Sequence, residues 1–477
     1  MTSKKFTKRN SFAVALIAAG ALGSSTATFA QSADEVTNVR VAGSDAMGLG
    51  FMPLLMEAYA AVRGEESVIT DTDVAGQYTV DYIGEDGFGD KVEGHLVTTS
   101  SSSGAFDALL DGSAEIGMSS RRITRDEARA LRSDGAGSMV DPNQEHIIAV
   151  DSIIVITHPE NPVNTLSLRD LRDIYTGDIR NWSDLGGPDL PIVVVHRDLD
   201  SGTGATFNER ILGAADATIS KAAVRMTDDT SVAAIVNAEP SVIGFVGLAF
   251  QRGAQPVQLV NDCRITMTPD AFSARTEEYL LQRRLYLYNR GDTLNPEGTN
   301  FLDFVTSPEV DDVILKSGFV DLGVDRTEMP LGGTRGRALL NSDADPYESG
   351  FMRNMVTDMT QYDRLSTTFR FGTASSRLDE RAQVDLERLT TYLASQPDAA
   401  EIKFVGFTDN AGEFDGNLAL SSNRAEQVMN EVRTYAGDRL SDVSFASAGY
   451  GEIAPVGCNT SSDGRRVNRR VEVWIKK

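Results

Sequence analysis

Two arginines and a group of serine and threonine hydroxyls lie in turns next to helix-like segments, an arrangement suited to holding an anion. The clearest case is Arg197, four residues before Ser201–Thr203, in a turn between an apolar run at 192–195 and a helix-like segment at 206–212. A helix N-terminus offers unpaired backbone N–H groups and a partial positive charge, and a guanidinium adds a fixed fork of donors for a tetrahedral oxyanion. Ser/Thr-Gly turns are more often ordinary helix caps, so this turn alone does not establish a ligand site.

Three further segments place hydroxyls at comparable positions. Ser44 follows one short apolar run, Ser102 and Ser103 precede a helix-like segment, and Ser120 and Arg121 follow another apolar run. Ligands of open α/β sheets collect at the carboxyl ends of the strands. Hydroxyl and amide donors suit a dehydrated anion because they bring no desolvated charge of their own. We therefore expect these turns to converge on one anion site.

The composition favours a folded protein of two or three domains that does not bind nucleic acid. The chain has 477 residues, of which 41% are hydrophobic and 24% charged, and its formal net charge is −24. A domain usually takes ~150 residues, and binding to a phosphate backbone needs a basic face. A small anion responds instead to the local field of its cleft, so the acidic balance does not exclude one.

The N-terminus has the pattern of a secretory signal peptide, predicted over residues 1–30. Basic residues precede an apolar run at 12–22 that is too short to span a membrane, and small residues occupy the cleavage position. No cysteine follows that position, so we expect no lipid anchor there. No later stretch is apolar enough to cross a bilayer, and the mature protein is expected to be exported and soluble.

Cysteine and histidine usage predicts neither a metal site nor a cofactor. The four histidines lack metal-ligand spacing, and the sequence holds no nucleophile elbow, P-loop or zinc-type cysteine pattern. Cys263 and Cys458 lie far apart in the sequence. An oxidising compartment permits a disulfide between them, but no spacing pattern supports one. We interpret them as two isolated thiols.

From about Val39 to Val320, the chain resembles the periplasmic phosphate-binding proteins of ABC importers. The similarity rests on the turns described above and on Asp170–Trp182, Val242–Val246 and Arg284–Tyr288. The resemblance implies that inorganic phosphate is clamped between two lobes, with an ABC permease as a further partner. The residues it assigns to phosphate are Ser44, Ala46, Met47, Ser102, Ser103, Ser120, Arg121, Arg197, Ser201, Gly202 and Thr203.

The same resemblance implies a two-lobed α/β periplasmic-binding-protein fold of type II at residues 31–325. The chain is expected to cross between the lobes near 122–150 and to return near 236–255. The second lobe would then cover about 150–235.

Two departures from the family pattern leave the ligand less certain than the fold. Ala46 and Met47 stand where the family often has Thr and an aromatic residue, although the Met47 N–H can still donate. Ser120 stands where some members have an aspartate that accepts the phosphate proton, which is how a site distinguishes phosphate from sulfate. Asp45 and Asp200 are candidate substitutes, with solvated or capping carboxylates as the alternative. Another tetrahedral oxyanion is therefore an alternative ligand for this site.

Residues 326–362 are predicted to be a linker because they are rich in turn residues, although methionines at helical spacing between 352 and 359 indicate a short helix. The pattern changes after it. A strand-like run at 368–371, two helix-like segments and a final alternating strand at 471–475 predict a small α+β domain at 363–477.

This C-terminal unit resembles the OmpA-like peptidoglycan-binding domain. The similarity rests on Gly406–Asp409, Leu420–Ala425 and Asn468–Val473. It implies that Asp409, Asn417 and Arg424 bind peptidoglycan. Asp409 and Arg424 match the pair that grips diaminopimelate, whose ammonium and carboxylate suit a carboxylate and a guanidinium. Phe407 stands where the family usually has His or Tyr. Without the resemblance, a surface ion pair between Asp409 and Arg424 would be the simpler interpretation.

Together these features predict a non-enzymatic, periplasmic solute-binding protein for phosphate uptake or scavenging, tethered to peptidoglycan on the outer-membrane side of the envelope. A phosphate-ester hydrolase and a structural envelope protein with a degenerate ligand site are the alternatives.

Overall fold

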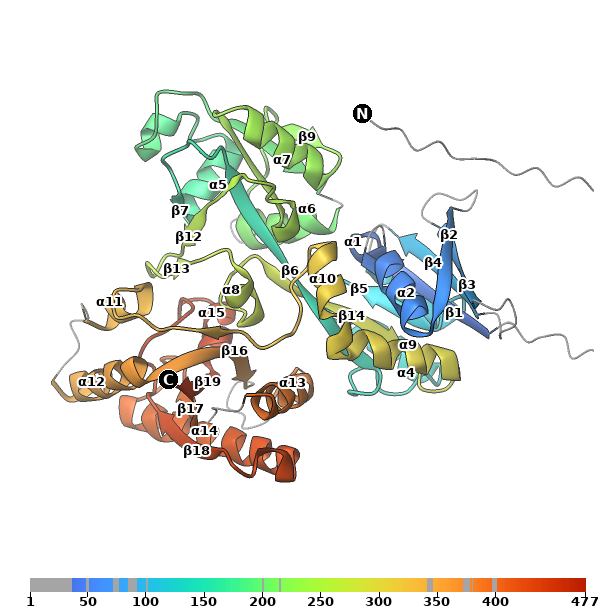
Figure 1. Ribbon diagram of the computed structural model, residues 1–477. Coiled ribbons are helices and arrows are strands. Elements are labelled where there is room, and N and C mark those ends of the chain that lie inside the picture. Colours follow the sequence, from blue (N-terminus) through green and yellow to red (C-terminus); the bar gives the residue numbers. More distant parts are fainter. Residues whose placement is uncertain are drawn as a thin grey trace, which may run out of the picture. The chain divides into compact units, whose positions relative to one another are not determined.

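The computed structural model describes residues 37–48, 51–71, 77–84, 92–99, 102–199, 201–213, 216–340, 346–371, 378–379, 381–396 and 401–477 (Figure 1). The predicted signal peptide and Asp200 lie outside these residues, as does the side chain of Asp45. No helix in these ranges combines the length and apolar character needed to cross a membrane.

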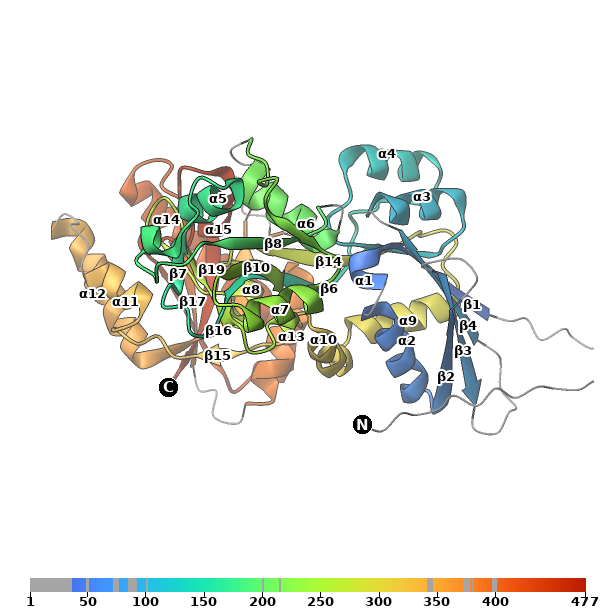
Figure 2. The ribbon, with the colours of Figure 1, turned by 90° about the horizontal axis from the view of Figure 1, so that it is seen from above.

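The first lobe is built on five neighbouring strands of one large mixed sheet. In sheet order these are β2 (Glu65–Asp71), β3 (Gln77–Gly84), β4 (Val92–Thr99), β1 (Thr37–Ser44) and β5 (Ile116–Ser119). Helices α2 (Phe51–Val62), α9 (Pro296–Thr306) and α10 (Asp311–Ser317) bury apolar side chains against one face. Helices α3 (Ser103–Asp111) and α4 (Arg125–Ser133) contribute to the core on the other face (Figure 2).

Two long antiparallel strands connect the lobes. β6 (Glu145–Thr157) and β14 (Gln282–Asn289) pair with each other. β14 also pairs with β5 of the first lobe, and β6 pairs with β10 (Val242–Gly247) of the second. β6 is buried over nearly all of its length and carries apolar runs at Ile147–Val150 and Ile153–Ile156, as a central strand does. This corrects the predicted return near 236–255, because the chain returns to the first lobe on β14.

The second lobe continues the large sheet through β10, β8 (Val193–Arg197) and β9 (Val224–Met226), with β11 (Gln255–Pro256) on β6. A separate small sheet has the order β13 (Thr266–Met267), β12 (Gln258–Val260), β7 (Thr165–Ser167). The α-helices of the second lobe are α5 (Leu168–Thr176), α6 (Gly202–Phe207), α7 (Asp229–Ala238) and α8 (Ala271–Arg275). Within the core, the rings of Phe207 and Phe245 stack with centroids 4.0 Å apart.

The C-terminal domain is a five-stranded sheet with helices on both faces. Its order is β15 (Arg326–Thr327), β16 (Tyr362–Arg370), β19 (Arg470–Lys476), β17 (Glu401–Phe407), β18 (Ser444–Gly449). Helices α13 (Ala382–Ala394) and α14 (Phe414–Ala436) pack on one face. Helix α15 (Ser462–Asn468) precedes the last strand. This agrees with the predicted small α+β unit.

Residues 326–362 do not behave as a free linker where the structure describes them. β15 joins the sheet, and helices α11 (Thr334–Leu340) and α12 (Pro346–Gln361) cover its second face through Leu339, Met355 and Met359. Arg335 makes two hydrogen bonds of 2.8 Å to the buried carboxylate of Glu472. The predicted methionine helix is present, but its apolar face packs in the domain core, so a flexible tether is wrong for these residues.

Cys263 and Cys458 form a disulfide rather than two isolated thiols. Their Cα atoms lie 5.4 Å apart although 195 residues separate them in the sequence. Cys263 lies in the turn between β12 and β13 of the second lobe, and Cys458 lies just before α15. Pairing over such a distance follows from how the domains pack, and sequence spacing carries no signal of it.

Candidate functional site

A polar cavity of about 240 Å³ lies between the two lobes. The first lobe contributes α1 (Asp45–Gly48) and α10, the second contributes the N-terminal turn of α6, and the connecting strands β6 and β14 complete the wall. Five of the predicted site residues line it: Ala46, Arg197, Ser201, Gly202 and Thr203. Segments more than 150 residues apart in the sequence therefore meet here.

The predicted turn at 201–203 begins a helix as expected. Ser201 is the N-cap of α6, and its hydroxyl accepts a hydrogen bond of 3.1 Å from the Gly204 N–H. The helix is short and continues into a π-helical turn at Asn208–Leu212. The hydroxyl of Ser201 thus has a structural role, and the N–H groups at the start of α6 lie at the cavity wall.

Three hydroxyls of the first lobe form a buried cluster beside the cavity. The Ser120 Oγ lies 3.4 Å from the Ser44 Oγ and 3.1 Å from the Ser102 Oγ, and the Ser120 N–H donates to the Ser102 Oγ over 3.0 Å. These residues come from the ends of β1 and β5 and from the start of α3. The turns that carry Ser44, Ser102 and Ser120 therefore lie side by side.

Arg283 on β14 joins this cluster to the second lobe, and the sequence analysis missed it. Its guanidinium donates to the Gly202 carbonyl (2.8 Å), to the Asp151 carboxylate (2.8 and 3.0 Å) and to the Ser120 Oγ (3.4 Å). A Cβ placed on Gly202 would lie 2.6 Å from this guanidinium and 2.8 Å from the Ala46 Cβ. The close approach of the two lobes therefore needs a glycine at 202. Two consecutive arginines directly before the apolar run Leu285–Tyr288 were the available signal.

Arg197 lines the cavity and pairs with a second residue that the sequence analysis missed. Its Nη1 lies 2.5 Å from the Asp229 carboxylate at the start of α7, while its buried Nε makes no hydrogen bond to the described residues. Burial raises the pKa of the Asp229 carboxyl, and Asp151 adds to this effect, although Arg197 opposes it. The cavity thus holds two guanidiniums, each facing one carboxylate.

The remaining predicted residues lie elsewhere. Arg121 turns to Glu127, with hydrogen bonds of 2.7 and 2.9 Å, and to the Ser103 hydroxyl at 2.9 Å. Its guanidinium also lies over the Phe106 ring, 5.4 Å from the centroid. Neither Arg121 nor Ser103 lines the cavity. The Met47 side chain is buried in the first-lobe core, which leaves its backbone as the part that faces the turn.

In the C-terminal domain, the structure brings Asp409 together with Arg469 as well as Arg424. The Asp409 carboxylate accepts from Arg469 over 2.7 Å, and Arg424 lies over the Phe371 ring, 4.9 Å from its centroid. Burial and the neighbouring Arg469 lower the pKa of Arg424, while Asp409 acts in the opposite direction. Asn417 donates to Glu452. Arg469 therefore belongs with the predicted pair.

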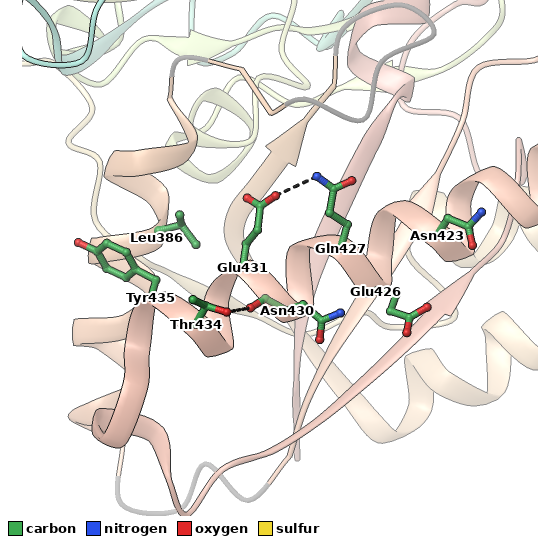
Figure 3. Close-up of a pocket in the computed structure, with 8 residues that line it drawn as sticks. All are labelled: Leu386, Asn423, Glu426, Gln427, Asn430, Glu431, Thr434 and Tyr435. Atoms are coloured by element: carbon green, nitrogen blue, oxygen red, sulfur yellow. Dashed lines mark hydrogen bonds between the residues drawn. The ribbon is translucent and has the colours of Figure 1, made fainter.

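A second, open hollow lies on the outer face of α14 (Figure 3). It is lined mainly by polar side chains, and the Gln427 amide donates to Glu431 over 2.9 Å. None of the predicted site residues lines it, because Asn417 and Arg424 are on the buried side of the same helix.

Two α/β lobes joined by shared strands around a polar cavity define a substrate-binding protein of the periplasmic type. The chain belongs to the PBP superfamily, whose domain matches residues 28–309. It also carries an OmpA family domain at residues 369–469. Both predicted family resemblances and the predicted fold class are confirmed.

Several relatives are named phosphate-binding protein PstS. The protein from Borreliella burgdorferi is 26% identical over 227 residues, covering 46% of this chain and 77% of that protein. The one from Bacillus subtilis is 27% identical over 214 residues, covering 44% and 67%. Among solved structures, an ABC-type phosphate transport receptor from Vibrio cholerae is similar over 59% of this chain and 99% of its own, with 22% identity and a TM-score of 0.43.

Proposed function

We propose that this protein is an exported binding protein for inorganic phosphate that is held at the cell wall by its C-terminal domain. The observation that carries the proposal is the cavity between the lobes. The N-terminal turn of α6 and the guanidiniums of Arg197 and Arg283 line it, and Arg283 connects it to the neighbouring hydroxyls of Ser44, Ser102 and Ser120. Neutral hydroxyl donors with two arginines suit a dehydrated oxyanion, and the relatives named PstS support phosphate as that anion.

The proposed phosphate ligands are therefore the residues that line or adjoin the cavity. These are Ser44, Ala46, the Met47 backbone, Ser102, Ser120, Arg197, Ser201, Gly202, Thr203 and Arg283. Ser103 and Arg121 are not retained, because they contact each other and Glu127 instead.

Asp151 and Asp229 are the proposed acceptors of the phosphate proton. Both line the cavity, whereas Asp200 and the side chain of Asp45 lie outside the described residues. At neutral pH phosphate carries a proton and sulfate does not, so an unprotonated carboxylate in the cavity favours phosphate and repels sulfate.

Isothermal titration of the mature protein with phosphate and with sulfate tests this function. We expect one phosphate site and at least tenfold weaker sulfate binding. No heat with either anion in a folded sample would contradict the proposal. A parallel phosphatase assay distinguishes binding from hydrolysis, and we expect no turnover, since the named relatives are binding proteins.

We further propose that Asp409, Arg424 and Arg469, with Asn417 beside them, bind the diaminopimelate of peptidoglycan. A carboxylate next to two guanidiniums complements the ammonium and carboxylate of that residue. The intact protein should co-sediment with purified peptidoglycan, and the variant Asp409→Ala/Arg424→Ala should stay in solution. The matched control Glu387→Ala/Arg439→Ala removes an exposed ion pair of the same domain and should pellet normally. A double variant that still pelleted would place wall binding on other residues.

A further inference from the structure

A cluster of three aromatic rings lies on the surface of the C-terminal domain. It consists of Tyr347 and Phe351 on α12 and Phe414 at the start of α14. The Tyr347 ring stands edge to face with both others, with centroids 5.3 Å from Phe351 and 6.0 Å from Phe414. Phe351 and Phe414 also pack on the core beside Phe407 and Tyr450, whereas Tyr347 is 56% exposed. The cluster therefore presents an ordered aromatic ring to solvent.

The surroundings of this ring are acidic. The Tyr347 hydroxyl donates to the Asp415 carboxylate over 2.8 Å, which fixes the position of the ring. Glu348 and Glu413 adjoin Tyr347 and Phe414 in the chain. Negative charge on this side disfavours an anionic ligand such as a phospholipid headgroup. An apolar ring beside carboxylate acceptors suits instead a neutral ligand with one apolar face and many hydroxyl donors.

The aromatic cluster is continuous with the residues proposed to bind diaminopimelate. Phe414 lies in the segment between Asp409 and Asn417, and it precedes Asn417 by one turn of α14, so the two side chains are neighbours on the helix. An extended chain covers at most ~3.6 Å per residue, so Asp409 and Phe414 are no more than ~18 Å apart. A ligand bound at Asp409 can therefore extend to the aromatic cluster.

The surface next to Phe414 is open to such a ligand. A Cβ on Gly412 or on Gly416 would meet no atom of the described residues within 4 Å. Gly412 has a φ of +102°, so its turn favours glycine. Gly416 is in the first turn of α14, and neither its backbone conformation nor packing among the described residues calls for glycine. A glycine allows the backbone to approach a ligand closely.

The helix that supplies two of the rings is an addition to the family domain. The OmpA family domain matches residues 369–469, and α12 ends before it. Met355 and Met359 bury α12 in the domain core, which places Tyr347 at the exposed N-terminal end of this helix. The residues that match the family domain therefore do not include this ring.

We propose that Tyr347, Phe351 and Phe414 form a subsite for the sugar rings of the glycan strand that carries the stem peptide. The inference rests on the proposed function, because it extends the diaminopimelate site along the same polymer. A pyranose has a face of C–H groups, which matches the Tyr347 ring, and hydroxyls at its rim, which Asp415 can accept. Because peptide and sugar are joined covalently, the two contacts reinforce each other.

The test is isothermal titration of the mature full-length protein with two probes, a free stem peptide that contains diaminopimelate and the same peptide linked to its disaccharide. We expect the wild type to bind the disaccharide-linked peptide at least about fivefold more tightly, as one aromatic contact provides. Tyr347→Ala should abolish this preference and change the affinity for the free peptide less than about twofold. Tyr347→Phe keeps the ring and should keep most of the preference.

The matched control is Tyr435→Ala. Tyr435, labelled in Figure 3, is another exposed tyrosine of this domain (39%), and its hydroxyl likewise donates to a carboxylate, that of Glu387. This variant should keep the preference for the disaccharide-linked peptide. Circular dichroism confirms that each variant is folded.

The two probes separate this inference from the proposed function. Equal binding of both probes by the wild type would overturn the sugar subsite alone, as would an unchanged preference in Tyr347→Ala or an equal loss in Tyr435→Ala. Binding of the disaccharide-linked peptide without binding of the free peptide would count against the proposed diaminopimelate residues and support the sugar subsite. Binding of neither probe would overturn both.

Discussion

Buried charges are arranged differently in two cavities of this protein. One lies between the lobes, and the other, lined by eight arginines, lies where both lobes meet the C-terminal domain. Between the lobes, Arg197 and Arg283 each face one aspartate, and burial, with a smaller contribution from Asp151, raises the pKa of the Asp229 carboxyl. In the arginine-lined cavity, Glu277 is shared among several guanidiniums and its pKa is lowered. The first arrangement leaves room for one small anion among neutral donors. The second shares one buried carboxylate among the guanidiniums of Arg284, Arg370 and Arg466.

The largest expected effect is on the shared carboxylate. Glu277→Gln should destabilise the protein by about 3–5 kcal/mol, because it leaves several buried guanidiniums without their counter-ion. Thermal unfolding followed by circular dichroism measures this. Glu387→Gln changes an exposed glutamate paired with one arginine and should shift the midpoint little. Equal shifts of the thermal midpoint in Glu277→Gln and Glu387→Gln would mean that Glu277 contributes no more stability than an exposed ion pair.

The disulfide tests whether this junction also depends on a covalent link. Cys263→Ser/Cys458→Ser should lower stability by about 2–4 kcal/mol, since it removes the constraint on a long loop of the unfolded chain. Phosphate affinity should change less than twofold, because neither cysteine lines the cavity between the lobes. Titration beside thermal unfolding checks both, and a tenfold loss of affinity would show that the junction controls lobe closure.

Within the phosphate cavity, Arg197→Gln should weaken phosphate binding about 10- to 100-fold. The loss corresponds to one hydrogen bond to a charged group, about 1.5–3 kcal/mol. Titration gives the affinity, and Arg129→Gln, at an exposed ion pair on the first lobe, is the control. An unchanged affinity in folded protein would remove Arg197 from the site.

The smallest effect concerns pH, and the two cavities should differ in sign. A lowered pKa means that Glu277 contributes stability above about pH 4.3 that is lost as the pH falls through its folded pKa. The raised pKa of Asp229 means that its contribution is lost as the pH rises from about 3.9 through its folded pKa. Thermal midpoints between pH 3 and 7 should therefore become less acid-sensitive in Glu277→Gln and more acid-sensitive in Asp229→Asn. Parallel profiles would contradict the comparison.

The local features of this protein were predictable from sequence because they depend on neighbours along the chain. The Ser201 cap and the α+β character of the C-terminal domain both follow from spacing and residue type. Ser44, Ser102 and Ser120 could be grouped because each ends a strand or begins a helix.

What could not be predicted depends on contacts between distant segments. Arg283 meets Gly202 only because β14 runs between the lobes, and Asp229 meets Arg197 across 32 residues. The disulfide and the packing of 326–362 against the C-terminal sheet have the same origin. Arg121 was predicted to bind the anion, but its guanidinium pairs with Glu127 on α4 instead.

The consecutive arginines of β14 make this strand unusually sensitive to its alignment. Successive side chains on a strand point to opposite faces. Arg283 lines the cavity between the lobes and pairs with Asp151, whereas Arg284 pairs with Glu277 and Asp379. A shift of one residue would move one arginine into the position of the other and bring Gln282 or Leu285 into the position that it left. Insertions or deletions in the segment before Gln282 should therefore be tolerated far less than substitutions there, since they alter which partner each guanidinium meets.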